Sequence, residues 1–127
     1  MMPDLLDFKT LAELCLRILL AMAIGGFVGW EREKSNRPAG LRTHMLVAIG
    51  AATVMMIGQL SWLHYEGIAN VDPTRLGAQV ISGIGFLGAG TILRDGLCIR
   101  GLTTAASLWS VACIGLAAGG GFYGVAI

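Results

Sequence analysis

Four long apolar segments, separated by short polar connections, dominate the chain. They run from about residue 14 to 30, 45 to 63, 76 to 93 and 102 to 118. Each is just long enough to cross the hydrocarbon core of a bilayer as a helix. The chain turns apolar again from residue 122, which predicts the start of a fifth helix. The pattern therefore predicts an all-α, polytopic membrane protein. Residues 1–127 would form one transmembrane domain, and we expect no soluble C-terminal domain within them.

Glycines interrupt the apolar segments, most densely in residues 82–93, which read SGIGFLGAGTIL. Each glycine costs roughly 1 kcal/mol in a water-exposed helix relative to alanine, but in a membrane small residues let two helices approach closely. Two further pairs have the small-xxx-small spacing, Gly25 with Gly29 and Gly115 with Gly119. The sequence therefore predicts tight, glycine-rich helix packing.

One face of the third segment carries small residues at a 4-3-4 spacing, namely Ala78, Ser82, Gly85 and Ala89. Other glycines lie on its remaining faces, with Gly88 on the side that has the fewest small neighbours. We therefore expect this helix to be central in the bundle and the 4-3-4 face to contribute to a homo-oligomer, most simply a dimer.

Polar residues at the segment boundaries predict where the helices begin. Asp72 followed by Pro73 is typical of an N-cap and a first helical position, so the third helix would start there, ahead of Arg75. Thr103 or Thr104 would cap the fourth. Within the spans the few polar residues include Gln79 and a hydroxyl stripe of Thr103, Ser107 and Ser110.

Positive charges are distributed unevenly between the two sides of these predicted spans. Six lie in the connections after the first and third segments, against three on the other side. Cytoplasmic loops carry the excess of Lys and Arg, so we expect these two connections in the cytoplasm and the N-terminus in the periplasm. Arg17 lies a turn inside the first span, where we expect it to snorkel outward.

A zone of mixed charge gathers at the predicted cytoplasmic edge. Its residues are Glu31, Arg32, Glu33, Arg37, Arg42, His44, Arg94, Asp95 and Arg100. One interpretation is topology anchoring with contact to lipid headgroups. The sharper one is an ordered Arg–carboxylate network that locks the loops or contacts a partner protein.

Several classes of function find no support in these residues. No Asp or Glu lies in the middle of a span, whereas ion-coupled transporters place ionisable groups near the midplane. We predict no catalytic, cofactor or metal site. The net charge of +1 gives no reason to expect a nucleic-acid partner.

Four ordered blocks of this sequence resemble the MgtC/SapB family. They are residues 29–33 (GWERE), 37–44 (RPAGLRTH), 83–90 (GIGFLGAG) and 100–106 (RGLTTAA). The resemblance covers nearly the whole chain from Ala21 onward. It implies a bacterial inner-membrane protein with an N-terminal domain of about five helices, to which many members add a soluble C-terminal domain. Against that pattern, the chain stops within the fifth helix.

The resemblance also implies a function, because the family is associated with survival at low magnesium and with virulence. Some members are similar to regulators of other membrane proteins, such as the F-type ATP synthase. The implied reading is a non-enzymatic regulator that acts through helix and cytoplasmic-loop contacts with another membrane protein. The alternatives are a small-ion, Mg²⁺-linked transporter or channel component, and a purely structural assembly module.

Overall fold

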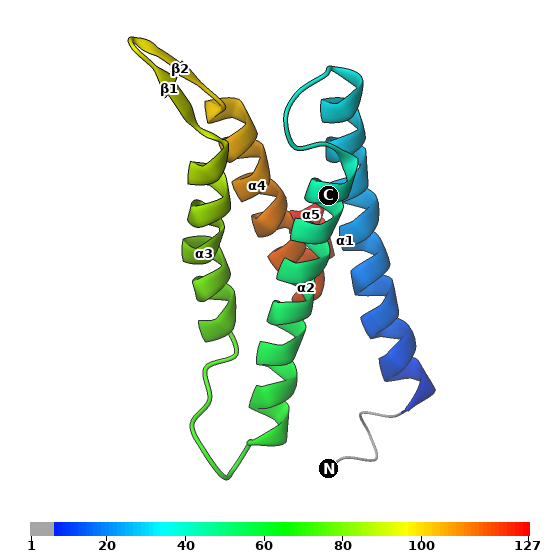
Figure 1. The fold of residues 1–127 in the computed structure, drawn as a ribbon. Coiled ribbons are helices and arrows are strands. Elements are labelled where there is room, and N and C mark those ends of the chain that lie inside the picture. The colour runs from blue at the N-terminus through cyan, green and yellow to red at the C-terminus, as the bar shows by residue number, and fades with distance from the viewer. Residues whose placement is uncertain (1–6) are drawn as a thin grey trace.

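The computed structural model describes residues 7–127, and it is mostly helical (Figure 1). The elements are α1 (Phe8–Lys34), α2 (Leu41–His64), α3 (Arg75–Thr91), β1 (Leu93–Asp95), β2 (Cys98–Arg100), α4 (Leu102–Gly119) and α5 (Tyr123–Ala126). Helices α3 and α4 begin and end within two residues of the predicted limits, whereas α2 begins four residues earlier than predicted and α1 extends further at both ends. The fifth segment forms a single helical turn.

A β-hairpin corrects the all-α prediction. Between α3 and α4 the chain forms two antiparallel three-residue strands, with Asp95 paired to Cys98. Gly96 is the first of the two turn residues and has φ of 61°, as the tight hairpin turns that match strand twist require. The third helix consequently ends at Thr91, two residues before the predicted limit. The Asp-Gly dipeptide of the connection was the available signal for this hairpin.

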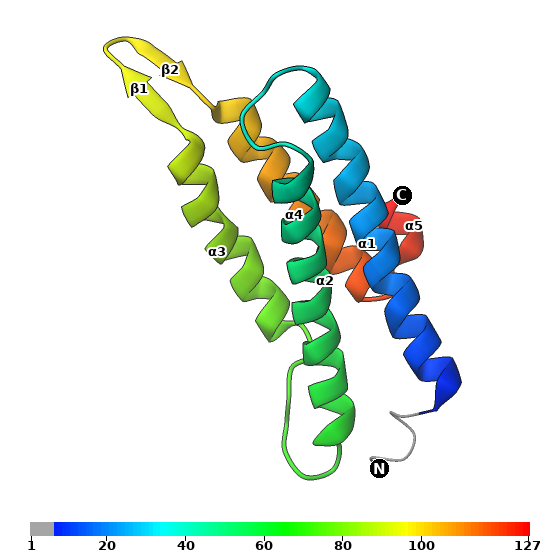
Figure 2. The same cartoon turned by 45° about the vertical axis from the view of Figure 1, so that its right-hand side comes forward.

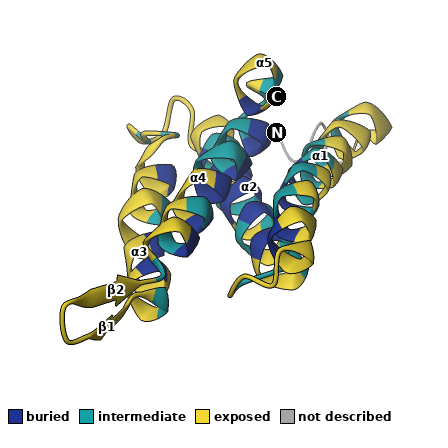
Figure 3. Ribbon diagram, turned by 90° about the horizontal axis from the view of Figure 1, so that it is seen from above, coloured by how far each residue is buried: buried dark blue, intermediate teal, exposed yellow. Residues whose placement is uncertain are grey.

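The centre of the molecule lies between α2 and α4, whose facing surfaces hold most of the buried residues (Figure 3). The buried core consists largely of alanines, including Ala48 and Ala52 of α2 and Ala112 and Ala118 of α4. Because membrane helices gain little hydrophobic energy from association, close packing of such small residues must hold them together.

The two predicted glycine pairs both lie against α2. A β-carbon added to Gly25 of α1 would lie 2.7 Å from the Ala48 Cβ, and one at Gly29 would lie 2.7 Å from the Leu41 Cα. On α4, a β-carbon at Gly115 would lie 2.5 Å from the Ala48 carbonyl oxygen. The helix backbones therefore approach so closely at these positions that only glycine fits.

Helix α3 is peripheral, so the prediction that it is central is wrong. It packs on α4 and α2 through Gly77, Ile84 and Gly88, which are its buried residues. A β-carbon added at Gly88 would lie 3.5 Å from the Ala105 Cβ of α4, so Gly88 is a packing residue within one molecule. A β-carbon at Gly85 would meet no atom within 4 Å.

Three helices are long and apolar enough to cross a membrane, namely α1, α2 and α4. Helix α3 has 17 residues and is therefore about 25 Å long at 1.5 Å per residue, compared with about 30 Å of hydrocarbon. The described residues thus contain three candidate spans, and a fourth at α3 remains a prediction.

Two predicted helix starts are wrong in detail. Helix α3 begins at Arg75, after Asp72 has accepted hydrogen bonds from the backbone N–H and the hydroxyl of Thr74 at 2.8 and 2.7 Å. These bonds, chiefly the one from the hydroxyl, lower the pKa of the Asp72 carboxyl. Helix α4 is preceded by Gly101 with φ of 90°, and neither threonine caps it.

The hairpin and the α1–α2 connection lie at the same end of the molecule, and the α2–α3 connection lies at the other (Figures 1 and 2). We call the end that holds the hairpin and the α1–α2 connection the hairpin end. Gly101 fixes the join between the hairpin and α4, because a β-carbon there would lie 1.9 Å from the Thr91 carbonyl oxygen. The chain thus holds the hairpin tightly between two helix ends.

Candidate functional site

A cluster of buried polar side chains joins three helices near the hairpin end. Arg32 of α1 is 7% exposed, and its Nη2 donates to the Thr104 hydroxyl of α4 and, at 3.5 Å, to the Pro38 carbonyl. His44 of α2 is fully buried, with Nε2 2.9 Å from the Ser107 Oγ of α4. These contacts tie α1 and α2 to the first two turns of α4.

The hydrogen bonds of His44 define its protonation at one nitrogen. Nδ1 lies 2.9 Å from the Gly40 carbonyl oxygen, and because a carbonyl can only accept, Nδ1 carries a proton. The Ser107 hydroxyl lies 2.8 Å from the Thr104 carbonyl as well. It has one proton, so it donates either to that carbonyl or to His44.

Beside this cluster lies a large cavity, of about 940 Å³, which we call the hairpin-end cavity. Its lining comes from the end of α1, the α1–α2 connection, the end of β2 and the start of α4. The lining includes three arginines, Arg32, Arg37 and Arg100, and one carboxylate, Glu31. The cavity therefore carries an excess of positive charge.

The predicted Arg–carboxylate network is not formed. Among the described residues the one ion pair is Arg17 with Glu13. Glu33 accepts instead from the Leu41 backbone N–H at 2.9 Å, Glu31 from the Ser35 hydroxyl at 3.4 Å, and Arg94 donates to the Gly96 carbonyl at 3.2 Å. The carboxylates are thus used to hold the connections in place.

The structure divides the predicted edge residues into two groups. Arg32 and His44 are buried, whereas the others are exposed, namely Glu31, Glu33, Arg37, Arg42, Arg94, Asp95 and Arg100. The hydroxyl stripe also divides, because Ser107 is partly buried while Thr103 and Ser110 are exposed. Thr104, the other candidate helix cap, is buried. No sequence pattern distinguished His44 from its charged neighbours.

A second polar cluster was missed by the sequence analysis. Arg17 does not snorkel outward; it donates to the Gln59 side chain at 2.8 Å and to the Gly119 carbonyl at 2.9 Å, and it pairs with Glu13. Gln59 in turn donates to the Gly120 carbonyl at 2.9 Å. An amide side chain inside an apolar span was the signal, because such a group needs a partner in lipid.

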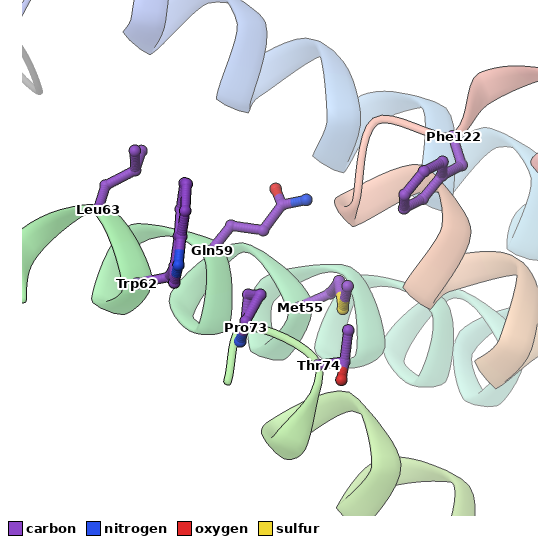
Figure 4. Close-up of a pocket in the computed structure, with 7 residues that line it drawn as sticks. All are labelled: Met55, Gln59, Trp62, Leu63, Pro73, Thr74 and Phe122. Carbon is purple, nitrogen blue, oxygen red and sulfur yellow. The ribbon is translucent and has the colours of Figure 1, made fainter. Parts of the chain in front are cut away.

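A smaller and mainly apolar cavity, of about 350 Å³, lies toward the other end (Figure 4). Met55, Gln59 and Trp62 of α2 border it, together with Pro73 before α3 and Phe122 after α4. Its one amide is already engaged with Arg17 and the Gly120 carbonyl. This cavity therefore has a mainly apolar lining with few free polar groups to bind a ligand.

The remaining predicted residues lie on the outer surface of α3. The 4-3-4 face, residues 78, 82, 85 and 89, is exposed along its whole length, as are Arg75 and Gln79. The structure brings none of them to either cavity. The face is open for lipid or another protein.

These features define a polytopic membrane protein whose apolar helices enclose polar contacts near both ends and carry an exposed hairpin. The chain belongs to the MgtC family, whose model matches residues 18–127. It is 45% identical over 114 residues to "Protein MgtC" of Brucella abortus (strain 2308), covering 90% of this chain and 45% of that protein. It is 42% identical over 118 residues to the "Putative magnesium transporter YhiD" of Escherichia coli (strain K12), covering 91% and 55%.

A third relative carries no functional name. An uncharacterized protein of Haemophilus influenzae is 46% identical over 110 residues, covering 84% of this chain and 46% of the relative. The chain thus spans about half the length of the curated relatives it matches. No solved structure matches it.

Proposed function

We propose that this chain is a non-enzymatic protein of the bacterial inner membrane that regulates other membrane proteins through direct contacts. The relevant setting is adaptation to low magnesium, because the relative from Escherichia coli is named as a putative magnesium transporter. The regulated protein would be an ATP synthase or a transporter. The contacts come from the hairpin end and from the exposed helix faces.

The observation that carries this proposal is the exposure of the hairpin. Leu97 at its tip is fully exposed, Leu93 is 67% exposed and Ile99 is 53% exposed. Arg94 and Arg100 alternate with these apolar side chains along the strands. Large apolar residues on a projecting and tightly anchored segment favour contact with a protein or with the membrane interface.

The alternative is a small-ion, Mg²⁺-linked transporter or channel component. The charge of the polar interior argues against it. The ionisable side chains buried among the helices include Arg32 and His44, which are hydrogen-bonded to helix α4. Hard divalent cations bind carboxylate and carbonyl oxygens, and a guanidinium repels them. The carboxylates nearest the hairpin-end cavity are exposed.

The proposed orientation places the hairpin end in the cytoplasm and the N-terminus in the periplasm, because the hairpin end carries the cationic connections. Cysteine labelling in a cysteine-free background can test it. A cysteine at Ser35 or Gly96 should be protected from an impermeant reagent applied to the periplasmic side. A cysteine at Ile68, at the other end of the bundle, should be labelled, and the reverse pattern would invert the model.

We further propose that the chain forms a homodimer through the exposed 4-3-4 face of α3. Small residues let helix backbones approach closely in lipid, which strengthens their packing, and a β-carbon at Gly85 has no neighbour within 4 Å in one molecule. A second copy could therefore approach there without a clash. Oligomer mass in nanodiscs measures this, and a monomer would contradict it.

Two measurements separate regulation from transport. Purified protein in proteoliposomes should give no Mg²⁺ flux above that of empty liposomes. Leu97→Ser should abolish complementation of a low-magnesium growth defect while protein amount and helix content stay unchanged. Ile68→Ser is the matched control, because Ile68 is 73% exposed at the other end of the bundle. Saturable flux would favour the transporter, and full growth with Leu97→Ser would contradict the proposed docking role of the hairpin.

A further inference from the structure

The hairpin-end cavity presents unused hydrogen-bond donors of a buried arginine. Both hydrogen bonds of Arg32 come from Nη2, and its Nε is buried with no acceptor among the described residues. A guanidinium carries five N–H donors. No residue in the described part of the chain accepts from Nε or Nη1, although Arg32 is more than nine-tenths buried.

No carboxylate of residues 7–127 neutralises this guanidinium. The one ion pair in the described part of the chain involves Arg17 and Glu13 at another site. Removing an unpaired charge from water is costly, and buried charges in proteins are therefore normally paired. Arg32 thus lacks the counter-ion that its burial calls for.

The start of α4 borders the same cavity with further free donors. Gly101 precedes the helix, no side chain caps it, and its first turn contains no acidic residue. The first α4 backbone N–H bonded within the protein is that of Ala105, to the Gly101 carbonyl at 2.9 Å. The preceding N–H groups and the positive end of the helix dipole favour an anion.

Two exposed arginines complete the lining. Arg37 comes from the α1–α2 connection and Arg100 from the end of β2, and neither forms an ion pair with a described residue. Their side chains are long and solvated, so both can turn toward a ligand in the cavity. Glu31 is the one carboxylate of the lining, which leaves the positive charge in excess.

From this arrangement we infer that the hairpin-end cavity binds a phosphate group, with Arg32 and the first turn of α4 as its fixed donors. A guanidinium matches the oxygens of phosphate through paired, charge-assisted hydrogen bonds. The volume of about 940 Å³ leaves room for a larger molecule that bears the phosphate. The group can come from an anionic lipid headgroup or from a soluble phosphate compound.

Binding can be measured on the full chain in an uncharged detergent at constant ionic strength. The probes are inorganic phosphate and pyrophosphate for the soluble source, and phosphatidylglycerol in mixed micelles for the lipid source. The readouts are the unfolding temperature, which a ligand of the folded state raises saturably, and lipid retention in native mass spectrometry. Chloride and acetate at equal ionic strength serve as controls and should leave the unfolding temperature unchanged.

The variant Arg37→Gln/Arg100→Gln tests the site without touching a buried residue. It should weaken binding at least about tenfold, because each lost hydrogen bond to a charged group contributes more than that factor. The matched control is Arg42→Gln, an exposed arginine at the same end that does not border the cavity; we expect less than about a twofold change. Arg32→Gln should abolish binding, and if it fails to fold, the exposed pair still decides the question.

Each outcome has a defined meaning. Binding of the soluble probes or of phosphatidylglycerol, lost in the double variant and kept in Arg42→Gln, supports the site and identifies the source. The absence of binding by all probes would overturn the inference. Equal loss in Arg42→Gln and in the double variant would also overturn it, because the effect would then be general surface charge.

Discussion

The contact between α2 and α4 at Gly115 offers the most direct test of the packing. In Gly115→Ala the new methyl would lie 2.5 Å from the Ala48 carbonyl oxygen, 3.0 Å from the Ala48 Cα and 2.9 Å from the Ala51 Cβ. Two of these atoms belong to the backbone and the third is bound directly to it. None can rotate away, so the helices themselves must separate.

The size of the effect follows from these distances. The shortest contact must lengthen from 2.5 Å to about 3.4 Å to become ordinary, so the helices move apart locally by about 0.9 Å. A gap of that size removes a quarter to a half of the dispersion energy of each affected contact. Overpacking of this kind costs about 1–3 kcal/mol. In water, alanine stabilises a helix by about 1 kcal/mol relative to glycine. This advantage is smaller in a membrane, because lipid already enforces the helical conformation.

We therefore expect Gly115→Ala to lower the free energy of unfolding by about 1–2 kcal/mol. The measurement is reversible unfolding in mixed micelles of dodecyl maltoside and dodecyl sulfate, followed by the helical circular dichroism signal. Gly50→Ala is the control, because it makes the same chemical change on α2 where a β-carbon meets nothing within 4 Å. Equal midpoints for the two variants would refute the close α2–α4 contact.

Three further predictions concern single sites. Gly85→Ile should leave the monomer stable and abolish the proposed dimer, whereas Gly88→Ile should destabilise the fold because it forces α3 away from α4. Unfolding midpoints and oligomer mass in nanodiscs distinguish the two variants, and equal effects would contradict the placement of α3. Ser107→Ala should lower the free energy of unfolding by about 1–3 kcal/mol, because it leaves the buried His44 Nε2 without a partner; an unchanged midpoint would contradict this contact. The carboxylate of Asp72 has a lowered pKa, so its support of the α3 start is present above the ordinary aspartate pKa and lost as the pH falls through the lowered value. The NMR amide signal of the threonine it bonds should follow that titration, and Asp72→Asn should remove it.

The sequence alone determined the class of protein and which connections lie at the same end of the helix bundle. The long apolar segments specify helices, because a backbone in lipid must satisfy its own hydrogen bonds. The alternation of long spans with short connections places the α1–α2 connection and the residues after α3 at one end. The glycine pairs of α1 and α4 were visible as contact points, and the structure gives both the same partner, α2.

The tertiary structure alone decided which face of each helix is buried. In a soluble protein the polar face reveals the outside, but lipid is as apolar as a protein interior, so the pattern of hydrophobic residues does not distinguish them. The small residues of α3 therefore predicted a central helix, although all four residues of the predicted interface face are exposed in the single molecule. That ambiguity is a property of the solvent and would affect any sequence of this kind.

The same limit applies to the polar site. Arg32 and His44 stand among charged residues that are exposed, and all of them satisfy the same positive-inside pattern. Their burial depends on the position of α4 along its axis, which places Thr104 beside Arg32 and Ser107 beside His44. Gly101 and the hairpin before it set that position. Contacts between residues more than 60 positions apart are determined by how helices pack, and local sequence patterns carry no information about that register.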